Sequence, residues 1–455
     1  FSRLYYLNTL GACAGALLTG FVLVRQFGVL ATLMIAVAGN LLVAAIIAAG
    51  KSPSAPPPPG KAEEAPHSYM LYVLFLTGFI SLSYEMLWVR ILSTYGLSTS
   101  QAFALIVAGF LLGFSAGAWW VSRRIDRGRN LEAVFSGVCV LTAASGAIVL
   151  YLFRRFEDLA RFLADALPMD YLAATLAMAF AVSVIPAVFM GVQFPLGLRI
   201  YAGDVHRIGV KAGNIFFSNT AGCVVGSLLT GFVLIPFAGM WNTTIVLVNL
   251  SLLIALVMIV RKHSFTPARM AGLVAVGVLS NLMVFADSKT FHTNVDGLDV
   301  IYYAEGLSGT VTALEKDRYR GLFVDGQNVS GTDPVLLADS KMLAHLPLLL
   351  AEDPEAALTV GYGTGTTSGS MLLHDVEVHA VEIEDKIIEA APLFSRVNYD
   401  SYADPNLRLV LDDARNYIDV VDRSFDAIVT DVTNLKYKRN PYLYTREYFV
   451  IMRDA

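Results

Sequence analysis

The C-terminal part of the chain contains Ala357-Leu-Thr-Val-Gly-Tyr-Gly-Thr-Gly365, an apolar run that leads directly into a glycine-rich turn. A short apolar run bounded by glycine is typical of a strand that is buried on both faces. Glycine also adopts the positive φ values that a tight turn at the end of such a strand requires. We therefore expect a strand, a sharp turn and then a helix that reaches about His374.

Three further strands are expected downstream, and each is followed by or ends in an acid. They lie at 376–382, ending in Glu382, at 407–411, followed by Asp412 and Asp413, and at 425–430, followed by Asp431. Alternating strands and helices form a doubly wound parallel sheet, which binds ligands at the carboxyl ends of its strands. An acid about 20 residues after the glycines suits a ribose diol. Residues 335–455 are thus predicted to form a Rossmann-like, methyltransferase-type domain that binds a nucleoside.

Residues 288–334 have a different pattern. Short apolar runs at 299–304, 309–314 and 320–325 are separated by glycine and charged residues, which predicts a small antiparallel sheet, or β-hairpin subdomain. A helix is expected at about 335–350.

The composition of the chain changes near residue 287. Residues 1–287 carry 18 Lys and Arg against 11 Asp and Glu, whereas residues 288–455 carry 15 against 27. The chain as a whole is 55% hydrophobic and 16% charged, which is too apolar for an ordinary soluble globule. The acidic C-terminal part argues against nucleic acid as a partner. The three cysteines fall in apolar runs and the histidines lack ligand spacing, so neither disulfides nor a metal site is expected.

Nine apolar runs are candidate membrane helices, which makes the lipid bilayer an expected partner. They lie at about 4–24, 28–49, 69–91, 100–122, 131–153, 171–197, 213–235, 241–260 and 269–286. Residues 50–68 form a proline-rich linker that cannot be helical, because proline lacks a backbone donor and fixes φ. Residues 154–167 suit a short amphipathic helix at the membrane interface.

One segment occurs twice in the chain. Leu17-Leu-Thr-Gly-Phe-Val-Leu23 is identical to residues 228–234, which lie 211 positions later. This spacing spans the linker and six helices, as in transporters built from parallel six-helix repeats. Residues 1–49 are then interpreted as the last two helices of a first repeat, and residues 69–287 as a complete second repeat with an extra helix.

Three pairs of glycines lie four residues apart within the apolar runs: Gly11 and Gly15, Gly113 and Gly117, and Gly222 and Gly226. This spacing lets two helices approach closely, so helix packing is the favoured interpretation. Asn8 and Asn219 occupy equivalent positions in the two copies. We interpret them as interhelical hydrogen-bonding residues in preference to the lining of a polar path.

The loop Gly117-Ala-Trp-Trp-Val-Ser-Arg-Arg-Ile-Asp-Arg-Gly-Arg129 joins the second and third helices of the complete repeat. It resembles a loop of major facilitator transporters that lies between the same helices on the cytoplasmic side. Lys and Arg gather on this side, which also makes it cytoplasmic. Nine spanning helices would place the C-terminal domain outside; if the ninth does not span, the domain is cytoplasmic.

Glu85 and Arg90 are the candidate functional residues within the apolar runs. A carboxylate inside a membrane helix is costly and is by default a sign of function. Both residues lie near a helix end, so two interpretations of Glu85 stand side by side. One is coupling to a substrate or proton, and the other is a structural ion pair or interfacial anchor.

Seven segments of the C-terminal part carry a family resemblance: residues 304–312, 324–326, 345–350, 381–384, 412–415, 425–431 and 443–449. Together they resemble spermidine synthases, the aminopropyltransferases that use decarboxylated S-adenosylmethionine. The helical part looks like the multi-helix portion of bacterial members fused to a membrane region. The resemblance implies the bacterial cytoplasmic membrane, decarboxylated S-adenosylmethionine or a related adenosyl nucleoside as substrate, no metal, and a small amine or polyamine. It also implies that the family's sheet continues beyond residue 455.

The resemblance gives roles to the residues at the strand ends. Those that would bind the nucleoside are Gly361, Gly363, Thr364, Gly365, Glu382, Glu384, Asp412 and Asp413. Glu382 falls on the ribose-binding acid, and the Asp412-Asp413 pair falls on the segment that recognises adenine. Asp431 is the position of the proton acceptor in an SN2 transfer, to which positioning and charge supply most of the rate.

Three positions depart from the family's pattern. Thr364 stands where an Asp of the family holds the donor's amine, and Asn434 stands where a second acid helps to bind the polyamine. Asp339 and Ser340 replace a Tyr-Gln pair of the polyamine groove. Nucleoside recognition is thus intact and amine binding is altered, with Asn434 and Asp339 as the candidate substrate-binding residues.

Two hypotheses follow. In the first, the chain is a membrane-integrated transferase of the spermidine synthase type with Asp431 as proton acceptor. In the second, it is a major-facilitator-like transporter or a subunit of a complex with other membrane proteins, and its C-terminal domain is a catalytically inactive binding module. The side of the membrane discriminates between them, because an adenosyl donor is expected only in the cytoplasm.

Overall fold

The computed structural model describes residues 2–50, 68–124, 130–202, 208–261, 266–282, 298–431 and 440–455. The chain divides into two compact units. The helical unit comprises Phe1–Val89, Ser100–Thr230 and Trp241–Asp287, and the C-terminal unit comprises Arg90–Thr99, Gly231–Met240 and Ser288–Ala455. Asn434, residues 125–129 of the facilitator-like loop and residues 51–67 of the linker lie outside the described residues.

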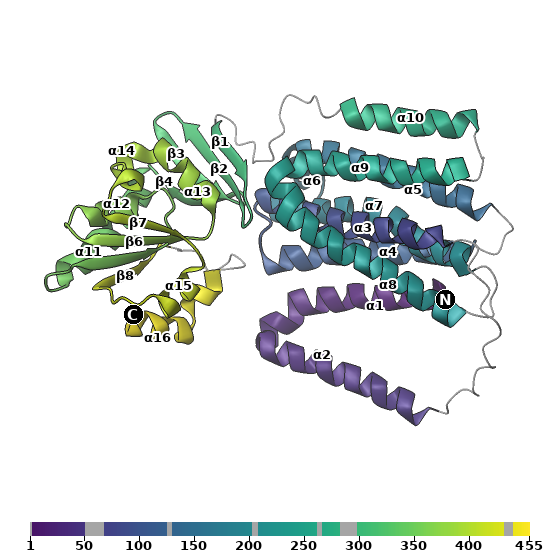
Figure 1. The fold of residues 1–455 in the computed structure, drawn as a ribbon, viewed down its shortest axis with the longest axis horizontal. Helices are drawn as coiled ribbons and strands as arrows, with labels where there is room; N and C mark the ends of the chain where they lie inside the picture. Colours follow the sequence, from purple (N-terminus) through teal and green to yellow (C-terminus); the bar gives the residue numbers. More distant parts are fainter. Residues whose placement is uncertain are drawn as a thin grey trace. The chain divides into compact units, whose positions relative to one another are not determined.

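The described secondary structure of the N-terminal region consists of helices joined by short turns (Figure 1). Its helices are α1 (Ser2–Leu18), α2 (Val24–Ala49), α3 (Tyr69–Thr94), α4 (Ser100–Ser122), α5 (Leu131–Arg154), α6 (Phe156–Ala166), α7 (Tyr171–Ala202), α8 (Ile208–Leu229), α9 (Ile235–Arg261) and α10 (Pro267–Leu282). The π-helical turns η1 (Thr19–Leu23) and η3 (Thr230–Leu234) join α1 to α2 and α8 to α9. Each of the nine expected apolar runs falls on a helix over its described residues, and α6 is the expected short helix.

Six stretches of the described residues are long and apolar enough to cross a membrane. They are Arg3–Ala49, Tyr69–Thr94, Ser100–Ser122, Leu131–Arg154, Tyr171–Ala202 and Val210–Arg261. The first and last each contain two of the expected runs, because the π-helical turns continue the helical hydrogen bonding between them. Helix α10 has 16 residues and is shorter than these stretches.

The repeated segment has the same unusual backbone in both copies. Each copy forms a π-helical turn, Thr19–Leu23 in the first and Thr230–Leu234 in the second. A glycine follows with non-helical angles, Gly28 at φ 76° and ψ 175° and Gly239 at φ 83° and ψ 157°. Glycine tolerates this conformation, so each long stretch kinks there. The repeat in the sequence is therefore also a repeat of local structure.

Two of the three glycine pairs lie at close helix contacts, as expected. A Cβ atom at Gly222 in α8 would come 1.9 Å from the carbonyl oxygen of Phe75 in α3. At Gly117 in α4, it would come 2.1 Å from that of Val188 in α7. Side chains larger than a hydrogen atom would force these helices apart.

The two copies of the repeat differ in what their polar and small residues contact. Asn219 Nδ2 donates a hydrogen bond to the carbonyl oxygen of Leu74 at 3.0 Å, which is the interhelical bond expected for it. Asn8 is exposed. A Cβ atom at Gly11 or Gly15 would meet nothing within 4 Å, so the described structure contains no close contact at this pair.

The C-terminal unit contains two sheets. Strands β1 (Asp299–Glu305), β2 (Thr310–Lys316), β3 (Tyr319–Val324) and β4 (Gln327–Gly331) form the expected antiparallel sheet in sequential order. The second sheet has the order β7-β6-β5-β8, with β5 (Ala356–Val360), β6 (Glu377–Glu382), β7 (Leu407–Leu411) and β8 (Ala427–Thr430) all parallel. All four expected strands of the Rossmann-like sheet are confirmed.

Helices cover both faces of the parallel sheet. Its described helices are α11 (Pro334–Leu350), α12 (Thr366–Leu372), α13 (Asp385–Ala390), α14 (Ser395–Asn398), α15 (Ala414–Val420) and α16 (Arg446–Asp454), and the 3₁₀ turn η7 (Asn440–Tyr444) precedes α16. Leu348 of α11 and Met371 of α12 pack in one core cluster, and Tyr417 of α15 and Tyr448 of α16 in another. The chain order reverses beside β5, since β6 lies on one side of it and β8 on the other, and ligands bind at such switch points.

Candidate active site

The turn after β5 has a backbone that depends on glycine. Gly361, Gly363 and Gly365 have φ values of 87°, 56° and 80°, a region that side chains with a Cβ rarely enter. At Gly365, a Cβ atom would also come 2.4 Å from the hydroxyl of Tyr362. The glycine-rich turn expected from the sequence is therefore present, at the carboxyl edge of the parallel sheet.

Glu382, at the end of β6, is held against this turn. Its carboxylate accepts hydrogen bonds from the backbone N–H groups of Tyr362 (2.9 Å), Ile383 (2.8 Å) and Glu384 (3.1 Å). The side chain is buried, and burial raises the pKa of Glu382 while these N–H groups counteract the rise. The backbone thus fixes an acid beside the turn at the position predicted for binding a ribose.

Asp412 and Asp413 follow β7 and are both exposed. The N–H of Asp412 donates to the carbonyl oxygen of Glu382 at 3.0 Å, which places this pair beside the end of β6. Asp413 begins α15 as its cap, because its Oδ1 accepts from the N–H of Arg415 at 2.9 Å. Both carboxylates are accessible from solvent at the same edge of the sheet.

Asp431 follows β8, on the other side of β5. Its N–H donates to the carbonyl oxygen of Val360 at 3.0 Å, and its Oδ2 accepts from the hydroxyl of Thr367 at 2.6 Å. The carboxyl group is partly buried, and its burial raises the pKa of Asp431 to about 6; the Thr367 hydroxyl counteracts this rise and the charge of Asp339 adds to it. A carboxylate with a pKa close to neutral is suited to general base catalysis.

Thr364, which stands where the resemblance leads us to expect a carboxylate, lies in a chain of hydroxyl groups. Its Oγ1 is 2.9 Å from Ser330 Oγ and 2.9 Å from Thr366 Oγ1. The Thr364 side chain is buried, and its carbonyl oxygen accepts a hydrogen bond from Asn398 Nδ2 at 2.9 Å. This part of the turn is thus occupied by hydroxyl groups that form hydrogen bonds with one another.

Glu384 contacts the β1–β2 turn in this structure. Its Oε2 accepts from the N–H groups of Ser308 at 2.7 Å and Gly309 at 2.8 Å. Burial raises the pKa of Glu384, and the N–H groups counteract the rise. The carboxylate predicted to bind the nucleoside is thus engaged by another strand connection.

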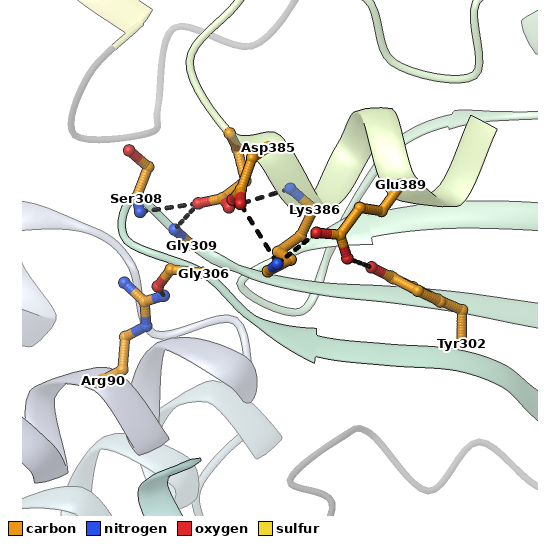
Figure 2. Close-up of polar contacts among 9 residues, drawn as sticks. Arg90, Tyr302, Gly306, Ser308, Gly309, Asp385, Lys386 and Glu389 are labelled. Atoms are coloured by element: carbon orange, nitrogen blue, oxygen red, sulfur yellow. Dashed lines mark hydrogen bonds and ion pairs between the residues drawn. The ribbon is translucent and has the colours of Figure 1, made fainter. Parts of the chain in front are cut away.

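The residues next to Glu384 bind the neighbouring strand. Lys386 forms ion pairs with Asp385 and Glu389, and the Tyr302 hydroxyl of β1 donates to Glu389 at 3.1 Å (Figure 2). Glu389, near the C-terminal end of α13, therefore fastens this helix to β1. These contacts and that of Thr367 could not be predicted from the sequence, because no local pattern indicates which distant residues they pair with.

Arg90 belongs to the C-terminal unit. Its Nη2 donates to the carbonyl oxygen of Gly306 in the β1–β2 turn (Figure 2). Glu85 lies in the part of α3 that belongs to the helical unit. Among the described residues, no ion pair joins Glu85 to Arg90, and both interpretations of Glu85 stay predictions.

The C-terminal residues match a known family model. Residues 336–455 match the model described as the spermine/spermidine synthase domain. A polyamine aminopropyltransferase of Korarchaeum cryptofilum is 34% identical over 113 residues, which cover 24% of this chain and 35% of the relative. One of Oceanobacillus iheyensis is 23% identical over 372 residues, which cover 78% of this chain and 69% of the relative.

Two solved spermidine synthases are also similar. One, in complex with the transition state analogue AdoDATO, has 27% identity and a TM-score of 0.32, with 34% of this chain and 54% of that chain covered. The Thermotoga maritima enzyme has 26% identity and a TM-score of 0.30, with 34% and 52% covered.

The family match shows a spermidine synthase domain at the C-terminus of a chain whose homologues are polyamine aminopropyltransferases. The chain spans about a third of the length of the Korarchaeum cryptofilum relative. The longer match to the Oceanobacillus iheyensis relative covers 78% of the chain and therefore extends well beyond residues 336–455.

Proposed function

We propose that this chain is a membrane-integrated aminopropyltransferase that uses decarboxylated S-adenosylmethionine or a related adenosyl sulfonium. The observation that carries the proposal is the placement of Asp431. This acid has a pKa near neutral and lies at the switch point of the sheet, across β5 from the ribose-binding position at Glu382. The family match and the names of the relatives support the same chemistry.

The nucleoside would lie along the carboxyl edge of the sheet. Glu382 is fixed beside the glycine turn, where its carboxylate edge can accept hydrogen bonds from two ribose hydroxyls. Asp412 and Asp413 at the next strand would receive the base. The sulfonium would then lie near the turn and Asp431, on the other side of β5.

The reaction is an SN2 displacement. The amine nitrogen of the acceptor attacks the aminopropyl carbon bound to sulfur, a C–N bond forms, and the C–S bond breaks to leave a thioether nucleoside. The nitrogen carries an extra proton after the attack, and Asp431 accepts it. Ionised Asp431 also attracts the cationic acceptor, and Asp339 on α11 adds negative charge there.

Two substitutions alter the amine sites that the resemblance implies. Thr364 brings a hydroxyl chain where an Asp would hold the donor's amine, and Asn434 replaces an acid that would help to bind the acceptor. Asp431 and Asp339 are then the acids left to bind the acceptor amine. We therefore propose an acceptor amine held by these two acids. The comparisons favour this transferase over a transporter or complex subunit with an inactive domain.

Binding and transfer by the full chain, purified in lipid nanodiscs, test the proposal. Calorimetry with decarboxylated S-adenosylmethionine and with its thioether product should detect a single nucleoside site. A diamine added with the donor should yield the thioether nucleoside and an aminopropylated amine in equal amounts. Absence of nucleoside binding would overturn the proposal, and binding without transfer to any di- or polyamine would overturn its catalytic part.

The helical region is proposed to cross the bacterial cytoplasmic membrane and to leave the transferase in the cytoplasm. Its apolar stretches support the crossing, and the Lys and Arg bias supports a cytoplasmic linker. Six crossings between the linker and Arg261 return the chain to the linker's side, and α10 has fewer than the about 20 residues that a span needs. A reporter that works only in the cytoplasm, fused after Ala455, should be active; activity of a periplasmic reporter alone would contradict this topology.

A further inference from the structure

The hydroxyl of Thr367 lies between two acceptors. Its Oγ1 is 2.6 Å from Asp431 Oδ2 and 3.3 Å from the carbonyl oxygen of Ser340. The Thr367 side chain is 1% exposed, so water has little access to compete for either contact. A hydroxyl has one proton and two lone pairs, and it therefore donates to only one of these acceptors at a time.

The two positions of this proton correspond to the two protonation states of Asp431. When Asp431 is ionised, the Thr367 hydroxyl donates to Oδ2. When Asp431 is protonated, the carboxylic acid can donate to Thr367 Oγ1, and the Thr367 proton can turn to the carbonyl oxygen of Ser340. Both states keep every partner hydrogen-bonded without moving a heavy atom, which avoids the cost of an unpaired buried group.

The other carboxylate oxygen stays available. Among the described residues, none donates a hydrogen bond to Asp431 Oδ1. Because Asp431 is only partly buried, this oxygen can be reached by a substrate. The geometry thus separates the two oxygens into one that is held by Thr367 and one that can meet an attacking amine.

We propose that Thr367 is the positioning residue of the proton acceptor, and that its hydroxyl turns between Asp431 and the Ser340 carbonyl as Asp431 gains and loses a proton. This inference rests on the proposed function, because it assigns Thr367 a part in the transfer through Asp431. The proposed function requires only the acids at the strand ends, whereas this inference also requires a hydroxyl group at position 367 of α12.

The charged and titratable groups around Asp431 set the direction of the expected effect. Asp339 of α11 raises the pKa of Asp431, and Tyr444 of η7 lies close enough for Asp431 to raise the pKa of the tyrosine. The Thr367 hydroxyl lowers the pKa of Asp431 because it donates to the ionised form. Removing the hydroxyl therefore raises this pKa, and a hydroxyl on a smaller side chain preserves it.

The test compares Thr367→Val with Thr367→Ser in the full chain in nanodiscs. The carboxylic acid C=O band of Asp431 is followed by infrared spectroscopy across pH and assigned by its loss in Asp431→Asn. We expect the titration midpoint to rise by about one pH unit in Thr367→Val and to stay unchanged in Thr367→Ser. The acidic limb of the transfer rate should move by the same amount.

Ser368→Ala is the matched control. Ser368 is buried on the same helix and its hydroxyl pairs with that of Thr359 at 2.9 Å, so its removal disturbs the core without touching Asp431. An unchanged midpoint in Thr367→Val, or an equal rise in Ser368→Ala, would overturn the proposal. If Thr367→Val fails to fold, Thr367→Ala provides the same comparison.

The infrared and transfer measurements separate this proposal from the proposed function. A shifted midpoint in a protein that transfers to no amine would support the role of Thr367 and overturn the transferase. A protein that transfers the aminopropyl group but whose Asp431 midpoint does not shift in Thr367→Val would support the transferase and overturn the role of Thr367.

Discussion

The carboxyl ends of β6 and β8 each hold an acid, and the two acids have different kinds of partner. Glu382 accepts hydrogen bonds from three fixed backbone N–H groups, whereas Asp431 accepts one from a side-chain hydroxyl. A backbone N–H cannot turn away or accept a proton in return, but a hydroxyl can do both. The difference indicates that Glu382 is built to stay in place as a binding group and Asp431 to change its protonation state.

The largest expected effect is on the reaction itself. Asp431→Asn removes the proton acceptor but keeps the shape of the side chain and an oxygen that can accept from Thr367. We expect the rate at saturating donor and amine to fall by about 10²- to 10⁴-fold, because that is the usual contribution of a general base. Nucleoside affinity, measured by calorimetry, should stay near that of the wild type; an undiminished rate would show that Asp431 is not the acceptor.

The second effect tests whether Glu382 binds the nucleoside. Glu382→Gln replaces one acceptor oxygen with an NH₂ group, which leaves a bound ribose hydroxyl without its acceptor. Such a mismatch costs about 1–3 kcal/mol, which corresponds to roughly a tenfold to hundredfold weaker nucleoside affinity if Glu382 binds the ribose.

The matched control for this variant lies on the same strand. Glu377 is a partly exposed acid at the start of β6 that pairs with His379 and Arg423. Glu377→Gln should leave the calorimetric affinity for the thioether nucleoside unchanged. Equal affinities of the two variants would place the ribose elsewhere.

The third effect concerns stability, and its sign follows from the raised pKa of Asp431. Between pH 4 and about 6 the folded protein keeps a proton on Asp431 that the unfolded chain, with an ordinary value of 3.8, has largely lost. The contribution of Asp431 therefore lowers the free energy of unfolding as the pH rises through this window. Asp431→Asn lacks this pH-dependent loss of stability and should be more stable than the wild type by about 3 kcal/mol at pH 7.

Thermal unfolding of the full chain at several pH values checks this prediction. The melting temperature of Asp431→Asn should exceed that of the wild type at pH 7, and the two should converge towards pH 4. The comparison of variants cancels the titration of the other carboxyl groups. A constant difference at every pH would mean that the effect does not come from the ionisation of Asp431.

Local patterns in the sequence were sufficient to predict the sheet and its edge. Each strand of the parallel sheet is a short apolar run beside glycine or acid, and the acids fall at the carboxyl ends because a parallel sheet aligns those ends. Glu382 and Asp431 could be placed at one edge for this reason. The turn was predictable because three positions with positive φ coincide with Gly361, Gly363 and Gly365.

Contacts between distant segments could not be predicted in the same way. Gly222 packs against α3, whereas a Cβ atom at its equivalent Gly11 would meet no described atom within 4 Å, although both segments carry the same Asn-Thr pair and the same glycines. Glu384 carried the family's acid motif, yet its partners lie 75 and 76 residues earlier in the β1–β2 turn. Such partners are set by the packing of whole elements and leave no periodic trace in the chain.

The smallest expected effect is at Glu384. Like that of Glu382, its carboxylate is held by backbone N–H groups, but these belong to the β1–β2 turn, so Glu384 tests whether fixed donors distinguish a structural acid from a ligand-binding one. If fixed donors make an acid structural, Glu384→Gln should loosen the β1–β2 turn by about 1 kcal/mol, the net value of a lost hydrogen bond. Hydrogen exchange should then speed up at Ser308 and Gly309, read by mass spectrometry on the full chain. Glu389→Gln, which alters an exposed acid on the same helix α13, is the control and should leave these amides unchanged. A loss of nucleoside affinity in Glu384→Gln without faster exchange would instead assign Glu384 to the ligand, as the motif predicts.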